Sequence, residues 1–290
     1  MTRIRLILLT SLAVLAVGAV ASASALAVPP AGCYKVAEAG TGTFEKSTCS
    51  GAAGTKEYIK VSKFETKLKA GEWCAKTETA GAGNYTTGAC TTIKTGENFI
   101  KVLVPEWAAN GVAVTTAKEV ESSGGTFTLT AGTLTVTCKK VTDKGKVEAG
   151  GKDIATEIKF TECTTGATGC AVKNKGGTLG TIVVTEIPTL LEEVGGKLVD
   201  KFEQKTVGAT KEFVTLEFEG EPCEEAGYVT TKVKGDVAAE VKNEANGEVK
   251  LTFPTTAIVQ TPKLEAFGKA AKLVGTDTEK LVNGEKLEGV

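Results

Sequence analysis

Apolar and polar residues alternate with a period of two in one segment after another from residue 105 onward. Leu134, Val136 and Cys138, for example, share one side of an extended segment whose other side carries threonines. Such alternation is typical of strands that bury one face. We therefore predict an all-β chain in which residues 105–290 form an antiparallel β-sandwich or a barrel-like domain. The strands expected there are 126–130, 133–138, 156–161, 181–187, 212–219, 228–234 and 248–253.

Glycine-containing pairs mark two of the turns in this region. Asn283-Gly284 lies between Leu281-Val282 and Glu285-Lys286-Leu287 and is a type I′ hairpin signal, so we expect the chain to end in a hairpin. Two interpretations compete over residues 188–202. Apolar residues there are spaced as on a helix, whereas Gly195-Gly196 sits where a tight turn would be. We favour a hairpin.

An internal repeat precedes this region. Residues 33–61 align without gaps on residues 74–102, at a period of 41 residues, and both copies contain two cysteines flanking a Gly-rich segment. We therefore predict two tandem cysteine-hairpin repeats over residues 28–104, each a small three-stranded meander. A scaffold role for these repeats is favoured over an adhesive or inhibitory one.

The first 27 residues have the order of a signal peptide. Arg3 and Arg5 precede an apolar run over 6–20, which leads into a stretch of small residues. The run is shorter than the roughly 20 residues that cross a bilayer. We predict cleavage after Ala27, with Ala25 as the alternative. The expected product is a secreted, extracellular bacterial protein without a membrane span after cleavage.

Eight cysteines in an exported chain indicate four disulfides. In each repeat a hairpin turning at the Gly-rich segment would place the two cysteines opposite each other. A short flexible loop separates the third pair, and the fourth follows by elimination. The absence of a C-x-x-C motif disfavours a zinc site. The predicted pairs are Cys33–Cys49, Cys74–Cys90, Cys163–Cys170 and Cys138–Cys223.

The composition excludes several kinds of chemistry. There is no histidine, and both arginines lie in the predicted signal peptide. The mature chain therefore has no Ser-His-Asp or Cys-His nucleophile system, no histidine metal ligand and no guanidinium for binding phosphate. The full chain, with a net charge of −1, also lacks the basic surface of a nucleic-acid-binding protein. We expect no cofactor, no metal site and no nucleic-acid partner.

Carboxylates and two tryptophans remain as candidate functional groups. A carboxylate pair could hydrolyse glycosides, but the abundance of glutamate does not single out a pair. Trp73 and Trp107 adjoin the second repeat and are the candidate exposed aromatics for stacking on sugar rings.

The leading interpretation is a non-enzymatic extracellular or cell-surface protein with a structural or binding role. Its partner would be an unknown extracellular ligand or a surface polymer. A carbohydrate-binding module is the alternative, followed by a carboxylate-dependent glycoside hydrolase and a hydrolase inhibitor.

Overall fold

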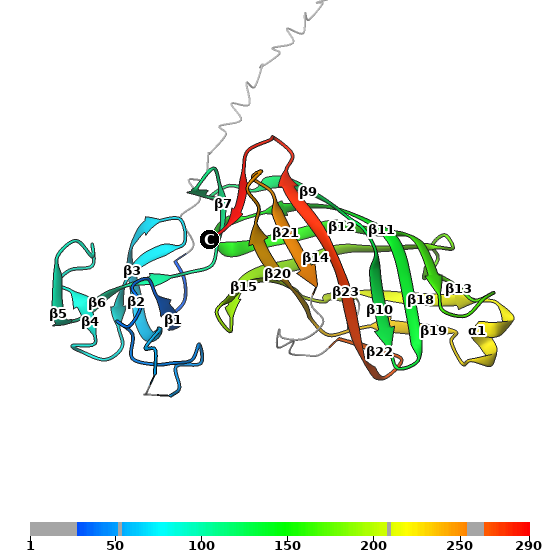
Figure 1. The fold of residues 1–290 in the computed structure, drawn as a ribbon, viewed down its shortest axis with the longest axis horizontal. Coiled ribbons are helices and arrows are strands. Elements are labelled where there is room, and N and C mark those ends of the chain that lie inside the picture. Colours follow the sequence, from blue (N-terminus) through cyan, green and yellow to red (C-terminus); the bar gives the residue numbers. More distant parts are fainter. Residues whose placement is uncertain (1–27, 52–53, 208–209, 254–263) are drawn as a thin grey trace, which may run out of the picture.

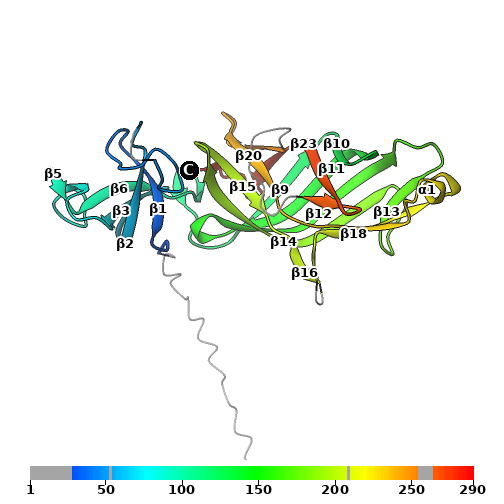
Figure 2. The same ribbon diagram turned by 90° about the horizontal axis from the view of Figure 1, so that it is seen from below.

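The computed structural model describes residues 28–51, 54–207, 210–253 and 264–290. The predicted signal peptide and its cleavage points therefore lie outside the described residues. The predicted all-β class is confirmed, because strands dominate and the described helical elements are a turn at Ala149–Gly151 and the five-residue helix α1 (Glu221–Glu225). Two groups of strands lie side by side along the long axis of the molecule (Figures 1 and 2).

The first group contains a small closed ring of four strands. Each of β1 and β3 pairs with both β2 and β6, and every pairing is antiparallel. We call these four strands the small ring. Its core includes Ile59, Phe64, Trp73, Ile100 and Val102. The strands of this group are β1 (Gly32–Val36), β2 (Tyr58–Lys69), β3 (Glu72–Thr77), β4 (Gly83–Tyr85), β5 (Ile93–Glu97) and β6 (Phe99–Leu103).

The small ring interleaves the two repeats. The first strand of each copy, β1 or β3, pairs with the last strand of both copies, β2 and β6. The bridge between Phe44 and Tyr58 in the first copy matches the pairing of Tyr85 with Phe99 in the second. Two separate three-stranded meanders were the prediction, and this is wrong: each copy completes its hydrogen bonding on the other.

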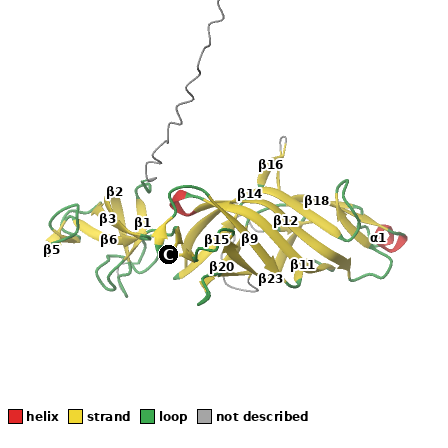
Figure 3. Ribbon diagram, turned by 90° about the horizontal axis from the view of Figure 1, so that it is seen from above, coloured by secondary structure: helices red, strands yellow, loops and turns green. Residues whose placement is uncertain are grey.

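The second group forms a larger closed sheet, which we call the large ring. Neighbouring strands around it are antiparallel, and β23 closes the circle by pairing with both β9 and β10, which lie end to end. The predicted barrel-like alternative thus describes this region, and Figures 1 and 3 show the strands wrapping around a common interior. In order around the ring, the strands are β9 (Lys118–Gly124) with β10 (Phe127–Ala131), β11 (Leu134–Val147), β12 (Lys152–Thr165), β14 (Thr181–Val194), β15 (Lys197–Phe202), β20 (Val237–Asn243), β21 (Val249–Phe253) and β23 (Lys269–Leu281).

Most alternating segments become strands as expected, and several are longer than predicted, but the predicted strand 212–219 is divided at Phe213 between two strands. The segment 133–138, for instance, is the first part of β11, which continues to Val147. The hairpin over 188–202 is confirmed, because Val194 pairs with Lys197 across Gly195-Gly196. Both glycines have positive φ values, 61° and 82°, a conformation that disfavours the competing helix.

The predicted C-terminal hairpin is wrong. A turn does form at Asn283-Gly284, but the strand that follows, β24 (Leu287–Gly289), pairs with β7 (Trp107–Ala109) instead of β23. The Asn243 side chain holds β24 there through two hydrogen bonds to the Gly289 main chain, of 2.8 and 2.9 Å. The chain end therefore closes one end of the large ring, next to the small ring (Figure 1).

Segments that connect the ring strands cover the opposite end of the large ring. A three-stranded sheet of β13, β18 and β19 lies there together with α1 (Figure 1). The remaining strands form short pairings elsewhere. The strands of the three-stranded sheet are β13 (Ala171–Asn174), β18 (Val214–Glu219) and β19 (Thr230–Val233), and those of the short pairings are β8 (Val112–Ala113), β16 (Lys205–Val207), β17 (Thr210–Glu212) and β22 (Glu265–Ala266).

Two of the four predicted disulfides are confirmed, Cys33–Cys49 and Cys74–Cys90. Their geometric basis differs from the prediction. Cys33 lies opposite Lys60 on β2, not opposite its disulfide partner, and Cys49 belongs to a turn with a φ of 50°. The bond therefore ties a turn back to a strand.

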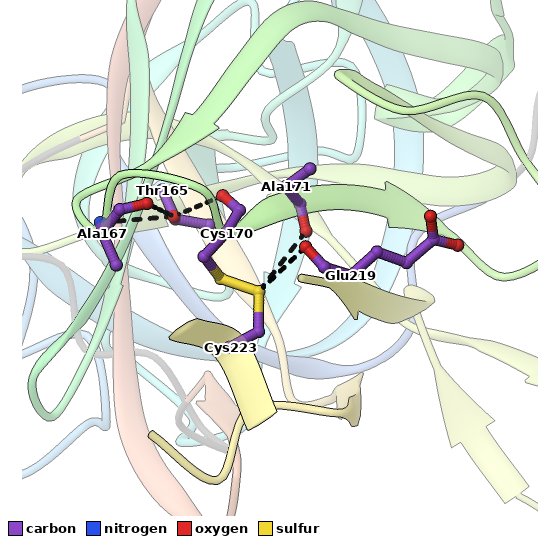
Figure 4. The surroundings of a disulfide bond; sticks show 6 residues. All are labelled: Thr165, Ala167, Cys170, Ala171, Glu219 and Cys223. Carbon is purple, nitrogen blue, oxygen red and sulfur yellow. Dashed lines mark hydrogen bonds between the residues drawn. A yellow bond between two sulfur atoms is a disulfide. The ribbon is translucent and has the colours of Figure 1, made fainter. Parts of the chain in front are cut away.

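The predictions Cys163–Cys170 and Cys138–Cys223 are wrong, because the bonds are Cys138–Cys163 and Cys170–Cys223. The register of β11 on β12 places Cys138 directly opposite Cys163. Since β12 continues to Thr165, Cys170 lies beyond the following turn and meets α1 (Figure 4). There the Thr165 hydroxyl donates a 2.7 Å hydrogen bond to the Cys170 carbonyl.

Tryptic digestion of the unreduced protein distinguishes these pairings. Cys163 and Cys170 share the peptide 160–173, so the structure predicts one species in which that peptide joins 119–139 and 212–232. The sequence-based pairing would instead release 160–173 with an internal bond. Mass spectrometry before and after reduction separates the two outcomes.

Candidate ligand-binding cavity

The interior of the large ring holds a cavity of about 100 Å³. Alternating residues of the ring strands point inward, and most of them are apolar. Phenylalanines form much of the wall: the Phe127 ring lies 5.6 Å from that of Phe160 and 5.3 Å from that of Phe253, which in turn lies 5.4 Å from Phe202. Segments between the ring strands contribute further apolar side chains to the lining, namely Phe213, Val214, Leu216, Val233 and Leu264.

Two carboxylates interrupt the apolar lining, those of Asp143 on β11 and Asp277 on β23. Beyond them lies a second cavity of about 10 Å³, roughly the volume of one water molecule. Asp143 and Phe202 line both cavities, so the two adjoin. We call the acidic side chains in and around the second cavity the acidic layer. Its members are Asp143, Asp153, Asp200, Asp277 and Glu279.

Strand register brings the acidic layer together. Ser122 on β9 is the neighbour of both Asp143 on β11 and Glu279 on β23, and its hydroxyl donates a 3.0 Å hydrogen bond to Asp277 Oδ2. Elsewhere around the ring, Asp153 on β12 pairs with Thr189 on β14, while Asp200 extends from β15. Carboxylates from four strands thus face one interior.

Four of these carboxylates are buried and that of Asp143 is half-buried, and all are short of hydrogen-bond partners. Asp200 is completely buried, and the exposed fractions of Glu279 and Asp277 are 5% and 6%. At least one side-chain oxygen of every member of the layer lacks a hydrogen-bond partner, and for Asp200 both oxygens do. Within the described part of the chain, no lysine forms an ion pair with any member. Burying an ionised carboxylate without compensation is costly, so this layer requires protons or a cation.

Burial and mutual repulsion raise the pKa values of the layer. Burial, followed by the charges of Asp277 and Asp200, raises the pKa of Asp143 to about 8. Burial raises the pKa of Asp200 to about 7 and that of Asp277 to about 6. Burial also raises the pKa values of Asp153 and Glu279 well above their usual range. Part of the layer is therefore protonated near neutral pH.

The two tryptophans predicted to be exposed are buried instead. Trp73 belongs to the core of the small ring, where its ring packs edge-on against Phe64 at 5.6 Å. Trp107 is completely buried at the end of the large ring. Neither indole face is available as an exposed stacking platform, because each is used in a core.

The sequence contained a partial signal for the acidic layer. Asp200 has the same strand parity as Leu198 and Phe202, and Asp277 and Glu279 share parity with Leu281. Acidic residues at positions whose neighbours of like parity are apolar indicate buried carboxylates. The abundance of acidic residues did not identify these five, because the parity of each position relative to its apolar neighbours, and not the number of carboxylates, marks them as buried.

Comparison with known protein families, curated proteins and solved structures gives no match. The site therefore has to be interpreted from its own geometry. Among the described residues, no group of three or more His, Cys, Asp or Glu side chains has the geometry to hold a metal ion. The same part of the chain contains no helix long and apolar enough to cross a membrane. Its four disulfides are typical of proteins in oxidising compartments.

Proposed function

We propose that this is a secreted, non-enzymatic binding protein of bacterial origin whose large ring holds a small apolar molecule in its interior. The observation that supports this most directly is the cavity of about 100 Å³, lined by phenylalanine and aliphatic side chains. Rings of about eight strands have an interior that side chains can fill or that can hold one small ligand. The signal-peptide pattern and the four disulfides support a site of action outside the cell.

The energetic cost of the cavity supports a role in binding. An unfilled apolar cavity lowers stability by about 24 cal/mol per Å³, so this one costs on the order of 2 kcal/mol when empty. That cost is removed if Phe or Leu side chains fill the space, or if a ligand does. A binding function accounts for the space being kept.

The alternatives have weaker support. A carbohydrate-binding module rested on Trp73 and Trp107, whose burial leaves it without an aromatic platform. A glycoside hydrolase needs two carboxylates across a sugar ring. Carboxylates do gather in the acidic layer, but the spaces beside them are a cavity of about 10 Å³ and a mainly apolar cavity of about 100 Å³, which does not suit a polar sugar ring.

Filling the cavity by mutation tests the proposal. Val184 lines the cavity, whereas Val183, one residue earlier on β14, has the opposite parity. We expect 1-hexanol to raise the melting temperature of the wild type and of V183W, because both keep the cavity, and to leave that of V184W unchanged. Calorimetric titration measures the same difference as binding heat.

Circular dichroism first establishes that both variants are folded. If V184W does not fold, I182F provides a smaller obstruction of the same wall, because Ile182 also lines the cavity. The proposal is overturned if hexanol binds neither the wild type nor V183W, or if it binds the obstructed variant as well as the wild type.

A further inference from the structure

We infer that the ligand of the large ring is an amphipathic amine, whose apolar body occupies the cavity and whose ammonium group meets the acidic layer. The inference rests on the proposed binding function and specifies the chemistry of the ligand. Its basis is an apolar cavity that ends at carboxylates without a counter-charge, each of which has an oxygen that lacks a hydrogen-bond partner.

The two ends of the site call for different parts of one molecule. Phe127, Phe160 and Phe253 line the cavity and favour an apolar body. Asp277, which is 6% exposed, lies on the same wall with an Oδ1 atom that has no hydrogen-bond partner. Asp143 likewise lines the cavity and has an unpartnered Oδ1. A molecule filling the cavity therefore has its end beside two acceptors.

An ammonium group satisfies this end better than other small polar groups. It brings three donors and a positive charge, whereas a hydroxyl group brings one donor and no charge. A ligand carboxylate would bring a further negative charge beside five acidic side chains. In a buried site, a hydrogen bond between charged groups is about twice as strong as one between neutral groups.

The remaining walls supply no competing cation. At the level of the acidic layer, β9 contributes Ser122 and β14 contributes Thr189, while β21 contributes Leu251. The described residues that line the two cavities include no lysine. The charge that balances the layer therefore has to come from protons or from a bound molecule. The cavity volume of about 100 Å³ limits the apolar body of that molecule to a short chain or a single aromatic ring.

Three probes with the same chain and different head groups test the inference on the full mature protein. We expect calorimetric titration at neutral pH to give hexylamine an affinity at least tenfold higher than that of 1-hexanol, and hexanoate no detectable binding. Because the layer holds protons when empty, the binding of hexylamine should also release protons. Titration in buffers with different ionisation enthalpies measures that release.

Isosteric neutralisation of the two carboxylates should remove the preference. In the variant D143N/D277N, hexylamine is expected to bind only as tightly as hexanol, and hexanol is expected to bind as it does to the wild type. The matched control is E119Q, which removes one negative charge from an exposed position on the outside of β9 and should leave all three affinities unchanged. D143N alone serves if the double variant does not fold.

The possible outcomes separate the inference from the function on which it rests. If none of the three probes binds, the proposed function fails. If hexanol and hexylamine bind equally, or if the wild-type preference survives in D143N/D277N, the amine inference fails and the apolar site stands. If calcium alone binds in a D143N-sensitive way and competes with hexylamine for the layer, the layer is a metal site and the inference is overturned.

Discussion

The ligand-free protein is expected to lose stability as the pH rises from about 5 to about 8. In the folded chain the pKa values of Asp277, Asp200 and Asp143 are about 6, 7 and 8, well above the ordinary value for aspartate. Between the unfolded and folded pKa values the folded state binds more protons, so unfolding releases them. The stabilising effect is therefore complete below about pH 4 and is lost as the pH passes through 6 to 8.

The three folded pKa values lie 1, 2 and 3 units above pH 5, and each unit corresponds to about 1.4 kcal/mol, so the expected loss is on the order of 8 kcal/mol and lowers the melting temperature by well over 10 °C. The chain has no histidine, so apart from the amino terminus no other group with an ordinary pKa titrates in this window. Calorimetric melting curves at several pH values measure the effect.

Variants at the acidic layer provide the control for this pH dependence. D143N/D277N removes two of the titrating groups and should flatten the profile, whereas E119Q, altered on the outer surface of β9, should keep the wild-type slope. A wild-type stability that stays constant or increases between pH 5 and pH 8 contradicts the assignment of protons to the layer.

The second large effect concerns Glu106, which joins the two rings. Its carboxylate is 4% exposed, lies 2.5 Å from the Lys67 ammonium group, and also accepts a hydrogen bond from the Gly71 main-chain nitrogen. Replacing Glu106 by Leu should lower the free energy of unfolding by about 3–5 kcal/mol, because it leaves the largely buried Lys67 charge without a partner. Denaturant unfolding measures the loss.

A double-mutant cycle tests whether the charge pair is the cause. In K67M/E106L neither charge remains, so this variant should be markedly more stable than E106L alone. The explanation is wrong if the double variant is as unstable as E106L, because the loss would then arise from packing or from the Gly71 hydrogen bond.

Local patterns in the sequence predicted strands and turns well. Alternation over 133–138 reflects a buried face, and two consecutive glycines at 195 and 196 supply the positive φ values of a tight turn. Which strands pair, and in which register, was harder to predict from the sequence, because the register depends on bulges that the alternation of apolar and polar residues does not reveal. One such irregularity separates Lys144 from Gly145 on β11, and Glu186 has a φ of 56° in the middle of β14.

The cysteine errors have the same origin. Spacing suggested that Cys163 and Cys170 close a short loop, but disulfide geometry depends on which strand lies opposite. That partner is β11, which brings Cys138 to Cys163. In the repeats, spacing led to the correct pairs for an incorrect reason, since turns and not facing strands carry Cys49 and Cys90.

The acidic layer was partly predictable and its function was not. The parity of Asp200 and Asp277 indicates that each points inward. What brings them together is the closure of the ring through β9, β10 and β23, which joins segments far apart in sequence. No single segment contains that information.

The interleaving of the repeats has a consequence for how such a structure could arise. A chain with only one copy would contain β1 and β2 and would leave one edge of each without a partner. Two such chains, related by a two-fold axis, could complete the same four strands between them. The present arrangement is thus equivalent to such a symmetric dimer with its two chains joined into one polypeptide, and loss of either copy would be equivalent to removing a subunit.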